Sequence, residues 1–333
     1  MNEHIVIVSP ALADANNGNW QTARRWQRLL QPHRVRITDH WPDGPAAEMD
    51  TVMLALHARR SADAIAAWAT LHGNAYAEDP SAAPGLAVIL TGTDLYRDIQ
   101  TDSQAQQSLQ FAQRLVLLQE RGPDALPPEL RGKSSVIFQS TPERATLQKP
   151  VRHLRAVMVG HLREEKSPTT LFEAARLLAP LDHILIDHIG APLDAALAAQ
   201  AQATAAACPH YRWLGGLAHE ATRRHIQRAH LLIHTSRMEG GAHVVMEAVR
   251  SGTPVLASRI AGNVGMLGPD YAGYFDWNDA TALVDLLRRC QHGDFLVQLQ
   301  AHCADRAPLF STESERVLLH RLIEALTTHT KNN

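Results

Sequence analysis

The chain has 333 residues, of which 45% are hydrophobic and 20% are charged, and its formal net charge is −2. Such a composition is typical of a globular protein, and the length favours two domains over one. The small net charge excludes a broad basic surface for nucleic acid or anionic membranes. The 3 cysteines include no CxxC pair, so neither a disulfide framework nor a zinc site is indicated. We therefore expect small-molecule partners and a reducing compartment.

Neither a targeting segment nor a metal motif is visible. The start, MNEHIVIVSP, has no charged segment followed by a long apolar stretch, and no run reaches the roughly 20 apolar residues that span a bilayer. A cytoplasmic location is therefore expected. The 19 histidines include no HExxH motif, and no two aspartates are separated by a single residue. We expect no metal.

Short apolar runs alternate with segments of helical length, which predicts a parallel α/β layout. In the first half, strands are expected at residues 4–8, 34–37, 52–56, 86–90, 115–118 and 136–138. The stretch 139–150, QSTPERATLQKP, loses the apolar rhythm and gains proline and charge, as an interdomain connection does. We therefore expect a first domain over residues 1–145.

A second series of the same kind follows, and it predicts a second domain over residues 151–310. Strands are expected at 156–159, 183–186, 231–234 and 254–257, with helices beginning near Pro168, Pro192, His219 and Ala242. The last helix, 312–327, has no strand after it, so residues 311–333 are expected to cross back onto the first domain. Two doubly wound, Rossmann-like domains facing a central cleft would place a ligand at the carboxyl ends of both sets of strands.

The segment EGGAHVVMEA, from Glu239 to Ala248, holds two glutamates eight positions apart behind a pair of glycines. If a helix begins just after Gly241, this spacing is a little over two turns and directs Glu239 and Glu247 to the same side. Glycines allow backbone N–H groups to approach a sugar or a phosphate. The alternative is an amphipathic helix with two solvated glutamates, and this motif alone does not decide between them.

Three segments of the second half resemble the donor domain of family 4 glycosyltransferases of the GT-B type. They are VGHLREEKSP from Val159, WLGGLAHEA from Trp213 and LLIHTSRMEGGAHVVMEAVRSGTPVLAS from Leu231. The resemblance implies that Glu239 contacts the transferred sugar, that Glu247 holds the ribose and that Lys166 neutralises the donor diphosphate. An ammonium group suits the last role because charge builds on the leaving group. Alternatively, Lys166 is a solvated residue ahead of a helix capped by Ser167.

Some positions depart from the family pattern. His161 stands where the family has arginine, so Arg163 could replace that charge or the site could rely on Lys166. Gly241 stands where an aromatic residue is usual and Ala242 where a glycine is usual, which implies a reshaped sugar pocket. Gly240 and His243 complete the expected donor site; a structural role for His243 is the alternative.

Segments of the first half resemble the selenosugar synthases of selenoneine biosynthesis, a small glycosyltransferase group. They are ANNGNWQTARRWQRLL from Ala15, LHARRSADAI from Leu56, TGTDLYRDI from Thr91 and LQE from Leu118. That group joins selenophosphate to the sugar of a UDP-sugar, typically UDP-N-acetylglucosamine. The resemblance therefore implies a UDP-sugar donor, a selenophosphate acceptor and no cofactor.

An anionic acceptor requires fixed positive charge, which Arg59 and Arg60 could supply beside Ser61, the expected N-cap of a helix. We expect further acceptor contacts from the strand-end residues His57, Asp94 and Tyr96, and contacts to the diphosphate or the acceptor from Gly18 and Asn19 in a turn. Surface arginines, a capping aspartate, a packed tyrosine and a plain turn are the ordinary alternatives.

Two rival functions remain open at this point. One is a glycosyltransferase with a hydroxyl acceptor, and the other is a noncatalytic module that binds nucleotide sugars. A dehydrogenase is disfavoured because SPALADANNGN, rather than GxGxxG, follows the first strand. The family resemblance implies retention at the anomeric carbon, but an unusual acceptor leaves the stereochemistry open.

Overall fold

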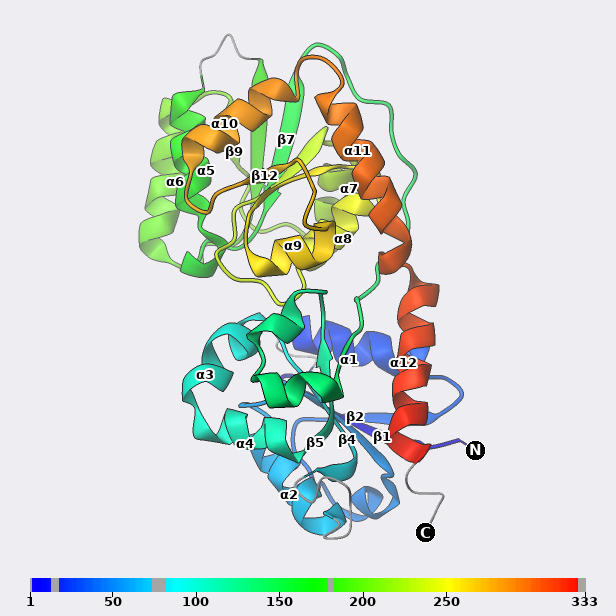
Figure 1. The fold of residues 1–333 in the computed structure, drawn as a ribbon. Coiled ribbons are helices and arrows are strands. Elements are labelled where there is room, and N and C mark those ends of the chain that lie inside the picture. The colour runs from blue at the N-terminus through cyan, green and yellow to red at the C-terminus, as the bar shows by residue number, and fades with distance from the viewer. Residues whose placement is uncertain (1, 13–17, 74–81, 179–182, 329–333) are drawn as a thin grey trace. The chain divides into compact units, whose positions relative to one another are not determined.

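The computed structural model describes residues 2–12, 18–73, 82–178 and 183–328. The chain divides into two compact units: unit 1 comprises residues 1–139 and 312–333, and unit 2 comprises residues 140–311. Each unit is built on its own six-stranded sheet, and neighbouring strands in both sheets run parallel. The predicted α/β class with two Rossmann-like domains is thereby confirmed (Figure 1).

In unit 1 the strand order is β2-β1-β3-β4-β5-β6. The strands are β1 (His4–Val8), β2 (Arg34–Thr38), β3 (Val52–Leu56), β4 (Ala83–Ile89), β5 (Ala112–Leu117) and β6 (Ser134–Val136). The helices are α1 (Gly18–Leu29), α2 (Ala62–His72), α3 (Ile99–Thr101), α4 (Ser103–Phe111) and α12 (Thr312–Thr327), and a π-helical turn, η3 (Asp94–Asp98), precedes α3. The order reverses between β1 and β3, where a ligand crevice is expected in a doubly wound sheet.

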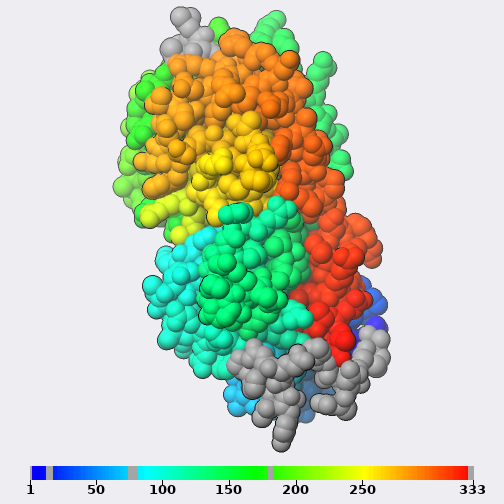
Figure 2. Space-filling view, in the orientation of Figure 1, coloured from blue at the N-terminus to red at the C-terminus, as the bar shows by residue number. Residues whose placement is uncertain are grey.

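Both faces of the unit 1 sheet are buried, which explains why its strands are almost continuously apolar. Ile5 and Ile7 pack with α1 and α12 on one face, and Val6 and Val8 pack with α2 and α4 on the other. Helix α12 lies beside α1 (Figure 1) and its outer side forms part of the surface of unit 1 (Figure 2). It is fastened there by the buried carboxylate of Glu315, which accepts hydrogen bonds from Arg25 and Trp26.

In unit 2 the strand order is β12-β11-β10-β7-β8-β9, which is the classical order of dinucleotide-binding folds. The strands are β7 (Leu154–Val159), β8 (Ile184–Ile189), β9 (Tyr211–Trp213), β10 (Leu231–His234), β11 (Val255–Ser258) and β12 (Tyr274–Phe275). The helices are α5 (Pro168–Leu177), α6 (Ala195–Ala207), α7 (His219–Arg228), α8 (His243–Val249), α9 (Ala261–Leu267), α10 (Ala280–Arg289) and α11 (Phe295–Arg306). Helices α5, α6 and α10 form one layer, and α7, α8 and α11 lie on the other side of the sheet (Figure 1).

The expected interdomain stretch, residues 139–150, is irregular, but from Ser140 onward it belongs to unit 2. The backbone N–H of Arg144 donates to the carbonyl oxygen of Arg250 at 2.9 Å, and Lys149 donates to the carbonyl oxygen of Gln227. These bonds explain why the division falls earlier than residue 145. Among the described residues, every helix is too short or too polar to cross a membrane.

Candidate functional site

The switch point of the unit 2 sheet lies between β7 and β10, and the loops that follow these strands are bonded to each other. Thr235 Oγ1 donates to the carbonyl oxygen of Lys166 at 2.7 Å, and the backbone N–H of Arg237 donates to the carbonyl oxygen of Glu165 at 2.9 Å. Loop residues 69 and 72 positions apart are thereby held together. This is the edge of the sheet at which doubly wound folds bind their ligands.

Lys166 and Glu239 meet across these two loops. Lys166 Nζ donates to Glu239 Oε1 at 2.5 Å, and His234 Nε2 lies 3.4 Å from the same oxygen. The Glu239 side chain is only 11% exposed. Burial by itself would raise the pKa of Glu239, but the charge of Lys166 and the hydrogen bond from His234 hold that pKa well below its ordinary value. The carboxylate therefore stays ionised beside a fixed cation.

A helix begins just after Gly241 as expected, but helical spacing does not relate the two glutamates. Helix α8 begins at His243, with Ala242 as its N-cap, so Glu239 lies in the preceding loop and only Glu247 is helical. Helix α9 fixes the loop instead: a Cβ on Gly262 would lie 2.1 Å from the carbonyl oxygen of Glu239. Only glycine permits this close approach, so the backbone of Glu239 is positioned by packing rather than by a helix.

Glu247 is buried in unit 2 among three basic side chains. Its Oε1 is 2.6 Å from Nε2 of His219, 3.5 Å from Nδ1 of His243 and 4.0 Å from Nε of Arg223. Burial opposes ionisation, but the hydrogen bonds from His219 and His243 lower the pKa of Glu247 to about 2. Glu247 is therefore a second buried carboxylate that is anionic at neutral pH. The contacts of Glu247 and those of Glu239 involve different residues.

His161 and Arg163, which are also expected at the donor site, follow β7 and have contacts of their own. His161 Nδ1 accepts a hydrogen bond from the backbone N–H of Ala191 at 3.1 Å, and desolvation, followed by the charges of Arg163 and Lys166, lowers the pKa of His161. Arg163 is exposed. His161, Arg163 and Lys166 thus form one electropositive group, although His161 itself tends to be neutral.

The glycine pair, Gly240 and Gly241, lies in the loop between Glu239 and α8. The backbone N–H of Ala242, which follows, is directed at the sulfur of Met266 at 3.1 Å. This N–H group therefore already has a partner within the protein, whereas the motif suggests a backbone donor that is free for a ligand. Ser167 stands at the N-cap of α5, but its side chain makes no capping hydrogen bond and instead accepts one from Trp277 at 3.0 Å.

In unit 1, His57 and Asp94 are buried side by side, and Asp94 is bonded to the loop that carries His57. Asp94 accepts hydrogen bonds from the backbone N–H groups of Ala58 at 2.7 Å and Arg59 at 3.4 Å, and its Oδ1 lies 3.1 Å from Nδ1 of His57. His57 has a φ of 81°, a left-handed value that few residues other than glycine adopt. Asp94 therefore holds the loop after β3 in place, as a buried anchor rather than an exposed ligand.

The two arginines of this loop have different surroundings. Arg59 Nη1 lies 3.6 Å from Asp98 and its Nε lies 3.5 Å from Asp102, whereas Arg60 is exposed and has no ion pair among the described residues. Ser61 occupies the expected N-cap position of α2, but its hydroxyl donates to the carbonyl oxygen of Leu56 at 2.8 Å instead of capping the helix. Arg60 is thus the arginine of the pair that is left for an external anion.

Tyr96, Gly18 and Asn19 are the remaining expected residues of unit 1. The hydroxyl of Tyr96 accepts a hydrogen bond from Gln119 at 2.8 Å, and burial raises the pKa of Tyr96 to about 12. Gly18 and Asn19 lie in the first turn of α1 rather than in a loop, and a Cβ on Gly18 would meet no atom within 4 Å. Asn16 and Asn17 of the same motif lie outside the described residues.

One group within the described ranges has donor atoms close enough to hold a metal ion, namely His57, Asp94 and Asp98. Asp94 already accepts from the backbone N–H groups of Ala58 and Arg59, and Arg97 Nε lies 3.2 Å from Asp98 in addition to the contact from Arg59. Guanidinium groups and amide donors thus supply the positive charge that these carboxylates require. The group is explained by ion pairing within unit 1.

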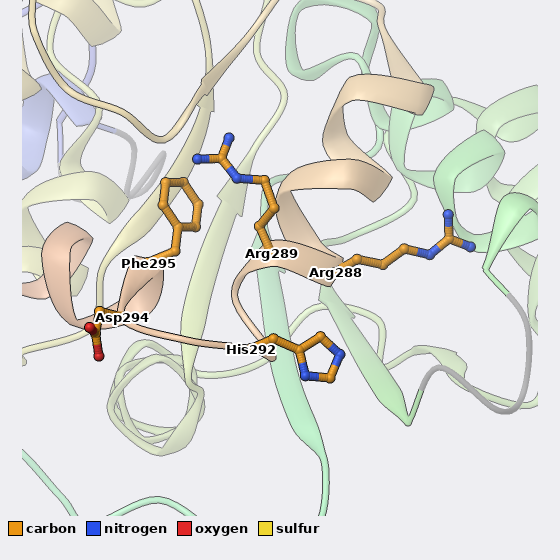
Figure 3. Close-up of a pocket in the computed structure, with 5 residues that line it drawn as sticks. All are labelled: Arg288, Arg289, His292, Asp294 and Phe295. Atoms are coloured by element: carbon orange, nitrogen blue, oxygen red, sulfur yellow. The ribbon is translucent and has the colours of Figure 1, made fainter.

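Two cavities of unit 2 lie at the amino edge of its sheet, opposite the glutamates. One, of about 430 Å³, lies where α10 ends and α11 begins; there the guanidinium of Arg289 stacks 3.9 Å from the ring centre of Phe295 (Figure 3). The other, of about 530 Å³, is lined by basic side chains near the start of β7 and the end of α7, and Arg155 and Arg212 there are paired with Asp187. Neither cavity includes an expected site residue.

Three basic residues near the glutamates were not expected from the sequence, namely His219, Arg223 and His234. His219 lies in the recognised segment WLGGLAHEA, but its contact with Glu247 spans 28 positions and has no local signal. His234 is the last residue of β10, and its place in a continuously buried strand indicates only that its side chain is buried. Their roles become visible once the loops at the carboxyl edge are assembled.

Comparisons with known proteins agree with this arrangement. Residues 139–309, about half of the chain, match the model of the family described as Glycosyl transferases group 1. No curated protein matches the sequence.

Among solved structures, HepE of Anabaena in complex with UDP and glucose is 14% identical with a TM-score of 0.71, over 97% of this chain and 100% of that chain. Sucrose-phosphate synthase of Thermosynechococcus elongatus is 15% identical with a TM-score of 0.72, over 98% and 100%. The pneumococcal O-GlcNAc transferase GtfA in complex with UDP and GlcNAc is 15% identical with a TM-score of 0.62, over 83% and 57%. At these identities the likeness concerns the fold, and the expected GT-B class is confirmed.

Proposed function

The chain belongs to the Glycosyl transferases group 1, and we propose that it transfers the sugar of a UDP-sugar to selenophosphate, as a selenosugar synthase does. The observation that carries the donor half of this proposal is the pairing of Lys166 with Glu239 at the switch point of unit 2. A buried anion beside a fixed cation offers partners for sugar hydroxyl groups and for a diphosphate in one place. Solved structures of similar fold hold UDP or UDP-glucose, which supports the same donor class.

On the donor side, Lys166 would stabilise the charge that develops on the diphosphate as the glycosidic bond breaks. Glu239 would accept hydrogen bonds from hydroxyl groups of the sugar, and Glu247 would accept them from the ribose diol. Both carboxylates have lowered pKa values and are thus acceptors at neutral pH. Arg163, which is exposed, would add positive charge near the diphosphate.

On the acceptor side, the resemblance of the first-half segments to selenosugar synthases supports selenophosphate. Arg60 is exposed at the start of α2 and has no ion pair among the described residues, so it offers a guanidinium to an anion. His57 is buried between Asp94 and Asp98, which makes it unsuitable as a general base for a hydroxyl acceptor. A selenophosphate anion needs no such base because its selenium is already nucleophilic.

The proposed step forms one bond and breaks one. A selenium lone pair attacks the anomeric carbon while the bond between that carbon and the diphosphate oxygen breaks, and UDP departs with the electron pair. The product is a sugar selenophosphate, and hydrolysis of its phosphorus–selenium bond by water yields the selenosugar and inorganic phosphate. No oxidant or reductant is required.

The test is to incubate the purified protein with UDP-N-acetylglucosamine and selenophosphate and to follow UDP release together with the mass of the product. We expect UDP release and a product with the isotope pattern of selenium. UDP release with simple sugars or lipids but not with selenophosphate would establish a hydroxyl acceptor instead. Binding of UDP without turnover on any acceptor would identify a noncatalytic nucleotide-sugar module.

A further inference from the structure

The carboxylate of Glu247 is covered on its solvent side by one imidazole. Glu247 is 6% exposed and His219 is 72% exposed, and Nε2 of His219 is 2.6 Å from Oε1 of Glu247. The other two basic neighbours, His243 and Arg223, are more deeply placed, with 39% and 6% of their side chains exposed. A ligand that approaches this carboxylate from solvent therefore meets His219 first.

The orientation of Glu247 does not depend on His219. The carboxylate is carried by the buried side of α8, and His243 and Arg223 also face its Oε1. Arg223 is itself fixed, because its Nη2 donates to the carbonyl oxygen of Pro142 at 2.7 Å. His219 thus contacts the carboxylate but is not needed to hold it in place.

We infer that His219 occupies Oε1 of Glu247 when no donor is bound and that its imidazole must leave before a ribose diol can bind there. The inference rests on the proposed donor role of Glu247. A diol recognised by a carboxylate donates two hydrogen bonds, one to each oxygen, and His219 holds one of those oxygens. His219 is therefore a residue that controls access to the donor site.

The position of His219 favours its displacement from Glu247. It is the first residue of α7, where the helix dipole disfavours a cation, and its exposed side chain can move into water. The hydrogen bond that His219 donates to Glu247, opposed by desolvation, raises the pKa of His219 above its ordinary value of 6.5. Below that raised pKa the ion pair is present and competes with the donor, and as the pH rises through it the ion pair is lost.

The other charged groups around His219 and Glu247 either keep their charge near neutral pH or can be distinguished from His219 by mutation. Glu220 and Arg223 on α7 act on His219, and neither a glutamate nor an arginine changes its charge near neutral pH. His243 on α8 also faces Glu247, but it is retained when His219 is replaced. A difference between the wild type and a His219 variant therefore isolates the imidazole in question.

The experiment measures the dissociation constant of UDP-glucose, whose diphosphate diester stays a dianion, by calorimetry between about pH 5.5 and about pH 8.5. For the wild type we expect the affinity to rise by about 3- to 5-fold over this range, as the loss of a partly exposed ion pair predicts. In His219→Gln the affinity at low pH should approach the value at high pH. His225→Gln is the matched control, because His225 lies on the same helix but faces Asp187 at 3.8 Å, and it should keep the wild-type dependence.

A second measurement, independent of affinity, follows the His219 imidazole by NMR. Its titration midpoint should fall toward 6.5 in Glu247→Gln and also when UDP-glucose is bound. A midpoint that does not change on UDP-glucose binding, or a His219→Gln variant that keeps the full pH dependence or binds more weakly at every pH, would overturn this inference alone. An absence of UDP-glucose binding at every pH would overturn the proposed function together with it.

Discussion

Charged side chains at the carboxyl edges of the two sheets are used differently. In unit 2, Glu239 and Glu247 are buried beside basic groups that are at least partly accessible, namely Lys166 and His219. In unit 1, Asp94 and Asp98 are equally buried, but Asp94 accepts from the backbone N–H groups of Ala58 and Arg59, and Asp98 pairs with Arg59 and Arg97. In the proposed function the first arrangement exchanges its partners for a ligand, whereas the second holds a loop in shape.

The difference shows that a buried carboxylate is not by itself a sign of a binding site. What separates the two units is the exposure and the attachment of the positive partner. His219 can leave Glu247 without disturbing a backbone bond, but the backbone donors of Ala58 and Arg59 cannot leave Asp94 without rearranging the loop before α2. Each prediction below tests one side of this contrast.

The largest effect is expected for Lys166→Gln in unit 2. Removal of a positioned cation from a developing charge lowers kcat by about 10²- to 10³-fold. UDP release measured under saturating substrates checks this, with circular dichroism to confirm folding. Lys133→Gln in unit 1, which removes a lysine outside the expected donor and acceptor residues whose ammonium donates to the carbonyl oxygen of Gln110, serves as the control and should retain activity. Full activity of Lys166→Gln would contradict the donor-site assignment.

Glu247→Gln should weaken binding of the UDP-sugar by about 10- to 100-fold, because a neutral amide replaces one of the two acceptor oxygens by a donor. Equilibrium binding of UDP-glucose measures this directly. Glu173→Gln, on the exposed side of α5, is the matched control and should bind as the wild type does. If both variants bind equally well, Glu247 is a structural carboxylate like Asp94.

Asp94→Asn should reduce the free energy of unfolding by about 1–3 kcal/mol, because the amide leaves at least one of the backbone donors of Ala58 and Arg59 without an acceptor. Urea denaturation followed by circular dichroism measures the loss. Asp63→Asn, at the exposed first turn of α2, should cost less, about 0.5 kcal/mol. Lost turnover with unchanged stability would mean that Asp94 contacts a substrate, and it would remove the contrast between the units.

The smallest effect separates the two neighbouring arginines of unit 1. Arg60→Ala should raise the KM for selenophosphate by about 10-fold, as expected for the loss of one charge-assisted hydrogen bond, without changing UDP-glucose affinity. Arg59→Ala should leave that KM nearly unchanged, because Arg59 already pairs with Asp98 and Asp102. Steady-state kinetics with varied selenophosphate distinguish them. A larger effect for Arg59 would mean that its ion pairs open when the acceptor binds.

Much of the fold could be predicted from the sequence because apolar runs mark buried parallel strands. Residues 4–8, 52–56 and 231–234 are strands with the predicted bounds, and the last helix spans Thr312–Thr327 as predicted. The strands β9 and β12 could not be found, since three and two residues are too few to show a period. Their places in the sheet are set by pairing with β8 and β11 rather than by their own residues.

The candidate site could be predicted only where its residues belong to recognisable segments. Lys166, Glu239 and Glu247 were visible in this way, although the geometry that joins the glutamates is not the helical one expected. Contacts that span many positions left no local pattern, as with His219 and Glu247. Arg59 pairs with Asp98, which lies in the π-helical turn η3, and no residue pattern predicts the geometry of that turn.

Helix α12 has a consequence for how the protein is made. Because unit 1 is composed of residues 1–139 and 312–333, unit 2 is an insertion within it, and the polypeptide passes between the units twice. During synthesis the whole of unit 2 leaves the ribosome before α12 does, and domains generally fold as units as they emerge. Until then the apolar surface around Trp26 that α12 covers stays open to water and to chaperones. Completion of the first unit must wait for the last helix to be translated.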